Sequence, residues 1–166
     1  FCNCHWFSRR KCYVDFRRYD VNVIYAPLSP VYWGEIYEAL LTVRQPDTAG
    51  VMAVDADTGE LLAAGIADTF SYSACNVHLI IKNPLVLRHG FFEEVFNYIF
   101  NTCDRAVVVG IVPGHNKKAL KLNKHLGYSE LCRIKDGFKL GTDYVILELR
   151  KEDCRWIPQN TEQEAA

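Results

Sequence analysis

Residues 107–128, which read VVVGIVPGHNKKALKLNKHLGY, decide the fold of this chain because their periodicity changes part-way along. Residues 107–112 are too few and too rich in β-branched side chains for a helix, so they predict a buried strand. Pro113 has no amide hydrogen and ends the strand, while Asn116 is a favourable residue to cap a helix. Gly127 suits a left-handed helix end. The stretch therefore predicts a strand, a tight loop and a helix that stops at Gly127.

The predicted helix has one apolar face, made by Ala119, Leu122 and Leu126. Its pattern, Asn116-x-x-Ala followed by an ending of Leu-Gly-aromatic, resembles the acetyl-CoA-binding half of the GNAT N-acetyltransferase family. The resemblance implies that the strand before the helix splays from its neighbour and that the thioester lies in the gap. It also implies that Asn116 contacts the pantetheine or phosphate arm of the cofactor. A plain helix cap is the other interpretation of Asn116, and both can hold.

Length and composition restrict the class of protein. A chain of 166 residues is expected to form one domain with a sizeable core. The net charge is −1 and 49% of the residues are apolar, but there is no apolar run of ~18 residues. We therefore expect a soluble protein with no membrane association, and nucleic acid is a poor candidate for its ligand. Seven scattered cysteines favour reduced thiols and a cytoplasmic setting.

Residues 1–20 form a basic, aromatic extension that differs from the rest of the chain. Its Cys2, Cys4 and His5 lack the ligand spacing of a zinc knuckle, so no metal site is expected. The extension is suited to contact nucleic acid or a protein partner, or it packs its aromatic side chains on the domain. Residues 21–157 are expected to form the domain, and residues 158–166 a polar tail.

The remaining elements follow from turn signals and apolar periodicity. Strands are expected at residues 21–26, 51–55, 60–67, 75–82, 129–135 and 144–150, with helices after Ser29 and around residues 91–103. Asp136 and Gly137 are expected to form the turn between the last two strands. The order matches the GNAT domain over residues 21–156. The fold class is therefore α+β, a three-layer α/β arrangement with a central mixed sheet of six to seven strands flanked by helices.

His78 is the candidate catalytic residue. In the strand at residues 75–82, Cys75 and Val77 share one face, whereas Asn76 and His78 share the other. The resemblance implies that this strand borders the thioester and positions the general base. An imidazole, with an unperturbed pKa near ~6.5, suits removal of a proton from an ammonium group. A histidine hydrogen-bonded between layers is the alternative.

The pyrophosphate loop of the family, Gln/Arg-x-x-Gly-x-Gly/Ala at a helix start, falls after Pro84. Backbone N–H groups and the helix dipole hold phosphate at such a site, which requires small residues. This chain keeps Gly90 in register but has Leu87 and Phe92 at the other two positions.

Charge near this loop is mixed. Glu93 and Glu94 in the first turn of the helix repel phosphate, each by on the order of a few kcal/mol before screening. Arg88 and His89 offset part of that repulsion. Lys117 opens a basic face of the later helix that is suited to meet the phosphates, although a solvated face is the commoner meaning of such lysines. The family's acidic tyrosine is replaced here by Asn123, which cannot supply a proton.

Two functions remain open. The first is an N-acetyltransferase that uses acetyl-CoA as co-substrate and an amine as acceptor, with direct attack on the thioester. His78 would act as base, and a backbone N–H among Val109, Ile111 and Val112 would polarise the carbonyl. The second is a catalytically inactive GNAT-fold structural or interaction protein, such as a phage virion component that contacts its partners through residues 1–20. The Asp-Gly pair after Gly-aromatic and the Cys-Arg-Trp ending resemble small GNAT-like proteins of tailed phages, and this resemblance implies a location in the host cytoplasm or the virion if the protein is encoded by a phage.

Overall fold

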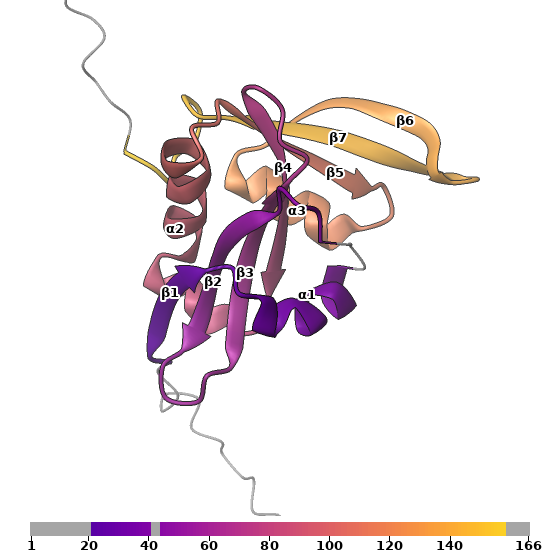
Figure 1. The fold of residues 1–166 in the computed structure, drawn as a ribbon. Helices are drawn as coiled ribbons and strands as arrows, with labels where there is room; N and C mark the ends of the chain where they lie inside the picture. The colour runs from indigo at the N-terminus through magenta and orange to yellow at the C-terminus, as the bar shows by residue number, and fades with distance from the viewer. Residues whose placement is uncertain (1–20, 41–43, 159–166) are drawn as a thin grey trace, which may run out of the picture.

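A single mixed sheet organises the computed structural model, which describes residues 21–40 and 44–158 (Figure 1). Within these residues seven strands follow the order β1-β2-β3-β4-β5-β7-β6. The expected sheet of six to seven strands flanked by helices is therefore confirmed. Residues 1–20 and the tail from residue 159 lie outside the described part of the chain, so the predictions made for them stay predictions.

The elements lie close to their expected bounds. The strands are β1 (Val23–Pro27), β2 (Ala49–Asp55), β3 (Leu61–Asp68), β4 (Ala74–Ile81), β5 (Val107–Pro113), β6 (Ser129–Lys139) and β7 (Thr142–Arg150). The helices are η1 (Pro30–Tyr32), α1 (Trp33–Leu40), η2 (Pro84–His89), α2 (Phe91–Asn97), the π-helical η3 (Tyr98–Thr102) and α3 (Lys117–Leu126). No helix in these described stretches is long and apolar enough to cross a membrane.

The N-terminal half of the sheet is an antiparallel meander, β1 to β4, with α1 on one face. Ser29 caps η1 through its hydroxyl, which accepts a hydrogen bond from the amide of Val31 at 3.4 Å. The apolar side of α1, with Ile36 fully buried, packs on Ile66 and Ile80 of the sheet. This face of β4 also carries His78, as the alternation of the strand predicts.

Helix α2 covers the opposite face (Figure 1), where the larger core cluster lies. Val95 of α2 sits directly over Gly65 of β3, where an added Cβ would come within 2.5 Å of the valine side chain. Further along, the ring of Phe96 lies 6.5 Å from the ring of Tyr128. Helix α2 therefore packs on both halves of the sheet. Phe91 and Phe100 are also fully buried.

The stretch at residues 107–128 folds as expected. Asn116 accepts a hydrogen bond from the amide of Ala119 at 3.1 Å and so caps α3. Gly127 ends the helix in the left-handed region, with φ of 106°. Trp156 then donates its indole N–H to the carbonyl of Leu126 at 3.0 Å, which fixes the end of the described chain against α3.

The prediction of a turn at Asp136 and Gly137 is wrong. Strand β6 continues through both residues to Lys139, and the chain reverses at Gly141, whose φ is 78°. Asp136 has a positive φ of 55° within an irregular stretch of the β6–β7 ladder. Its carboxylate accepts a hydrogen bond from the amide of Gly141 at 2.6 Å. Asp136 therefore stabilises the turn at Gly141 through its side chain, and the Asp-Gly pair does not itself form the turn.

Candidate active site

The centre of the sheet is interrupted between β4 and β5. Their parallel ladder consists of three residue pairs and ends at Asn76 and Val109. Beyond this point β4 continues to pair with β3 as far as Ile81, and β5 continues to pair with β7 as far as Pro113. The two strands therefore diverge while each keeps its outer partner. Polar backbone groups that face the gap are left outside the ladder and are available to a ligand.

A cavity of about 200 Å³ occupies the gap. It is bounded by the diverging strands, by one face of α3 and by the end of α1, and its lining is Leu40, Val77, His78, Leu79, Ile111, Val112, Pro113, Asn116, Ala119, Leu122, Asn123 and Tyr128. Four residues predicted from sequence thus come together here: His78, Ile111, Val112 and Asn116. Val109 lies in the last pair of the ladder, just before the strands part.

His78 forms a pair with Asp68, a residue that sequence reasoning missed. The Nε2 atom of His78 lies 3.1 Å from Oδ2 of Asp68, whose side chain is 8% exposed, whereas that of His78 is 34% exposed. Because a carboxylate only accepts hydrogen bonds, the neutral imidazole donates its Nε2 hydrogen to Asp68. That assignment leaves Nδ1 as the acceptor atom of the ring, so the pair has the geometry of an oriented base.

The missed carboxylate had a usable signal. In the β3–β4 ladder Ile66 lies opposite His78 and Asp68 lies opposite Asn76, so Asp68 is a diagonal neighbour of the histidine on the same face. The register follows from the chain reversal between residues 68 and 74. Thr69 adds a hydrogen bond from its hydroxyl to Oδ1 of Asp68 at 3.1 Å.

Asn123 of α3 and Tyr128, which follows α3, line the opposite side of the cavity. Asn123 donates its side-chain amide to the carbonyl of Ala119 at 3.1 Å and holds no acidic proton. Tyr128 is 7% exposed, and burial raises the pKa of its phenol well above the usual range. The cavity therefore offers a base on the β4 side and hydrogen-bonding groups, but no strong acid, on the α3 side.

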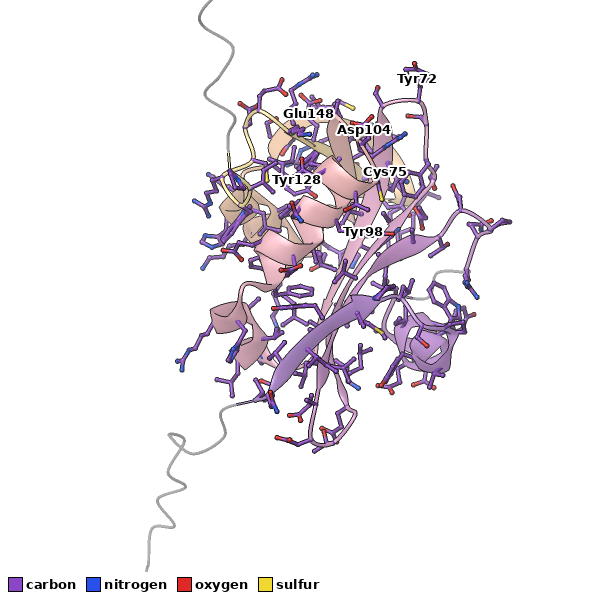
Figure 2. All side chains as sticks on the ribbon, turned by 60° about the vertical axis from the view of Figure 1, so that its left-hand side comes forward. Tyr72, Cys75, Tyr98, Asp104, Tyr128 and Glu148 are labelled. Carbon is purple, nitrogen blue, oxygen red and sulfur yellow. The ribbon has the colours of Figure 1, made fainter. Side chains whose placement is uncertain are left out.

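Cys75 is not a nucleophile for this cavity. It is buried on the α2 face of β4, away from His78 and close to Cys103. Figure 2 labels it together with Tyr128, which belongs to the same core cluster, and Tyr98, which packs against that cluster. Burial raises the pKa of its thiol to about 12, so the thiolate is absent at neutral pH. A covalent acyl-cysteine route through Cys75 is therefore unfavourable.

The predicted phosphate loop lies outside the cavity lining. Gly90 is in the left-handed region, with φ of 82°, directly before α2. The carbonyl of His89 accepts a hydrogen bond from the Tyr25 hydroxyl at 2.9 Å. Burial, and then the carboxylates of Glu94 and Glu93, raise the pKa of Tyr25 to about 12. The helix start thus has the negative character that the sequence indicated.

The other two predicted cofactor residues have different surroundings. Arg88 lies in the last turn of η2 and does not line the cavity. Lys117 is the first residue of α3, exposed and next to Asn116, which does line it. Positive charge is therefore available beside the cavity at α3 and further away at Arg88.

A second hollow of about 460 Å³ lies where β3 begins, at Leu61, and where the chain leaves β4, at Lys82. It is lined by Glu35, Glu60, Lys82 and neighbouring residues, and Glu35 and Lys82 form an ion pair across it. Their charges neutralise each other, and the hollow contains neither His78 nor a strand break. Among residues 21–40 and 44–158, no three potential metal ligands gather in one place. The gap between β4 and β5 is therefore the candidate active site.

Comparison with known proteins supports this fold. No protein-family model and no curated protein matches the sequence. Solved structures do match: spermidine N-acetyltransferase from Vibrio cholerae in complex with CoA and spermine has a TM-score of 0.62 at 12% identity, over 80% of this chain and 97% of that one. The spermidine/spermine N-acetyltransferase SpeG of the same organism, in complex with manganese ions, has a TM-score of 0.61 at 12% identity, over 79% and 94%. The GNAT-like fold expected from the sequence is therefore confirmed.

Proposed function

We propose that this protein transfers an acetyl group from acetyl-CoA to an amine by direct attack on the thioester. The single observation that carries the proposal is the gap between β4 and β5, which has the His78–Asp68 pair on one side and Asn116 on the other. A gap in a sheet that is otherwise continuous offers both space and unpaired backbone donors. The structure of a protein with this fold in complex with CoA and spermine lends support.

Each group has a role in the proposed reaction. His78 accepts a proton from the acceptor ammonium, directly or through a water, while Asp68 keeps the ring in one orientation. The free amine then forms a C–N bond with the thioester carbonyl, whose oxygen is polarised by a backbone N–H between Val109 and Val112. Collapse of the tetrahedral intermediate breaks the C–S bond, and the second proton of the nitrogen leaves to water, so that the products are a neutral amide and the thiolate of coenzyme A. Asn123 and the buried Tyr128 are poor acids, so the thiolate of coenzyme A leaves without a dedicated proton donor.

Cofactor contacts are proposed for the α3 side of the gap. The side-chain oxygen of Asn116 accepts the capping hydrogen bond from Ala119, so its side-chain NH₂ group is the part that can reach the pantetheine arm. Ile111 and Val112 form the apolar wall, and Lys117 and the more distant Arg88, His89 and Gly90 face the phosphates. The protein would act in the cytoplasm, or in the host cytoplasm if it is encoded by a phage.

Thermal stability in the presence of acetyl-CoA tests the proposal. At about 100 times its dissociation constant, a ligand that binds the folded state adds ~2.7 kcal/mol to the free energy of unfolding. For a domain near this size the melting temperature should rise by roughly 5–10 °C. Release of free thiol in the presence of an amine then measures transfer.

A flat melting curve at millimolar acetyl-CoA, in protein shown to be folded, would overturn the enzymatic proposal. It would favour the second candidate, a structural or interaction protein with a GNAT-like fold. The observation behind that candidate is the negative start of α2, where Glu93 and Glu94 lie beside Tyr25. A role in a phage particle is one form of this candidate and would require partners for residues 1–20.

A further inference from the structure

The face of the sheet that carries His78 continues past the gap as an open apolar strip. The strip consists of Ile111, Ile134, Tyr144 and Ile146, which pair across β5, β7 and β6 in neighbouring rows. Ile111 and Ile134 are 49% and 50% exposed. Helix α1 covers the same face over β2 to β4, so the strip begins where the helix ends.

The strip is continuous with the proposed active site. Ile111 belongs to both, because it lines the cavity and pairs with Ile146. Val108 and Val112 of β5 are buried in the α2-side core, so Ile111 lies on the opposite face, as His78 does on β4. At the far end Phe138 lies 5.6 Å from the ring of Tyr144 and extends the surface with an aromatic group.

Carboxylates are scarce around the cavity and the strip. None lines the cavity among the residues that the structure describes. Asp68 is engaged by His78 and Thr69. Glu148, on the same face of β7, accepts hydrogen bonds from Arg150 at 3.3 Å, and its side chain is 17% exposed. A second or third ammonium group on a substrate would therefore gain no counter-ion from the cavity lining, whereas an apolar group would gain contact with the strip.

We infer that the acceptor is a primary amine attached to an apolar or aromatic group, and not a polyamine. This inference rests on the proposed acetyl transfer. The amine lies at His78, and the apolar group lies along the strip, where removal of apolar surface from water stabilises the complex. The ammonium loses its charge when His78 takes the proton, so a single amine leaves no unpaired charge in the site.

A panel of amines at saturating acetyl-CoA tests the inference through thiol release. We expect kcat/KM for 2-phenylethylamine and hexylamine to exceed that for putrescine and spermidine by about tenfold or more, the scale of one lost apolar contact. The variant Ile134→Glu should raise KM for 2-phenylethylamine by about tenfold and narrow the preference over spermidine. Ile24→Glu is its matched control, because Ile24 is also 50% exposed and lies on the opposite edge strand, β1.

The outcomes separate the inference from the function. Transfer that prefers spermidine, or equal effects of Ile134→Glu and Ile24→Glu, would overturn the inference and leave the acetyltransferase intact. Absence of transfer to every amine, together with no stabilisation by acetyl-CoA, would overturn the function itself. Light scattering adds a further check: a dimer that Ile134→Glu dissociates, with unchanged amine kinetics, would show that a second copy covers the strip instead.

Discussion

Two strand–helix units border the gap, and they differ in what they offer a ligand. The unit of β4 and α2 carries His78, which pairs with Asp68 at the end of β3, but its helix begins with Glu93 and Glu94. The unit of β5 and α3 carries no ionisable side chain on its strand, but its helix begins with Asn116 and two lysines. The positive end of a helix dipole is thus reinforced at α3 and opposed at α2.

The difference indicates a division of labour within the proposed function. Proton transfer depends on the β4 side, and attraction of the negatively charged co-substrate depends on the α3 side. Substitutions that change one property without the other can therefore separate turnover from binding.

Replacement of His78, the proposed base, should have the largest effect, because it should lower turnover and leave acetyl-CoA binding unchanged. We expect His78→Ala to lower kcat by ~10²-fold or more, because the acceptor ammonium then has no positioned group to take its proton. Stabilisation by acetyl-CoA should stay at the wild-type value, since the α3 side is unchanged. Thiol release and melting temperature are measured on the same preparation. A loss of stability with no selective loss of rate would show that His78 is structural.

Charge reversal at α3 should act on binding. We expect Lys117→Glu to weaken acetyl-CoA binding by about fivefold, because it replaces attraction for the phosphates by repulsion at a helix start. Calorimetry at low and high salt measures the effect, which should shrink as salt screens the exposed charge. Lys135→Glu makes the same change on β6 and is the control. Equal losses in both variants would mean that net charge, and not the start of α3, attracts the ligand.

Neutralisation at α2 should have the smallest effect and the opposite sign. We expect Glu93→Gln to strengthen acetyl-CoA binding by about twofold, as one exposed like charge is removed from the helix start. Glu38→Gln on the exposed side of α1 serves as the matched control. If Glu93→Gln leaves the dissociation constant unchanged, the phosphates do not approach α2, and the phosphate loop suggested by the family pattern is unused.

Much of the fold was predictable because its signals are local. The cap at Asn116, the stop at Gly127 and the alternation around His78 depend on neighbours within one element. The misplaced turn shows the limit of such reasoning. Asp-Gly is a strong turn signal, but Asp136 satisfies its hydrogen-bonding capacity by bonding Gly141, and the chain reverses later.

The site was predictable only in part, for a different reason. His78 and Asn116 were identified because each fits a pattern within its own element. Asp68 was missed because its position beside His78 depends on the register between β3 and β4, which has to be worked out from the chain reversal between them and not from the pattern within one strand. Arg88, His89 and Gly90 were assigned from a family pattern that this chain matches at one position, and the cavity lining does not include them.

The short ladder between β4 and β5 also has a mechanical consequence. The sheet consists of two parts, which we call plates: one contains β1, β2, β3 and β4, and the other contains β5, β7 and β6. Three residue pairs between β4 and β5 join them. Helix α2 braces both plates: Val95 rests on Gly65 of the first, and Phe92 contacts Trp156, with ring centroids 5.0 Å apart, beside the second. The angle between the plates is therefore set by aromatic packing on the face opposite His78. Substitution of Phe92 by a smaller residue would change how wide the gap opens without touching any group that lines it.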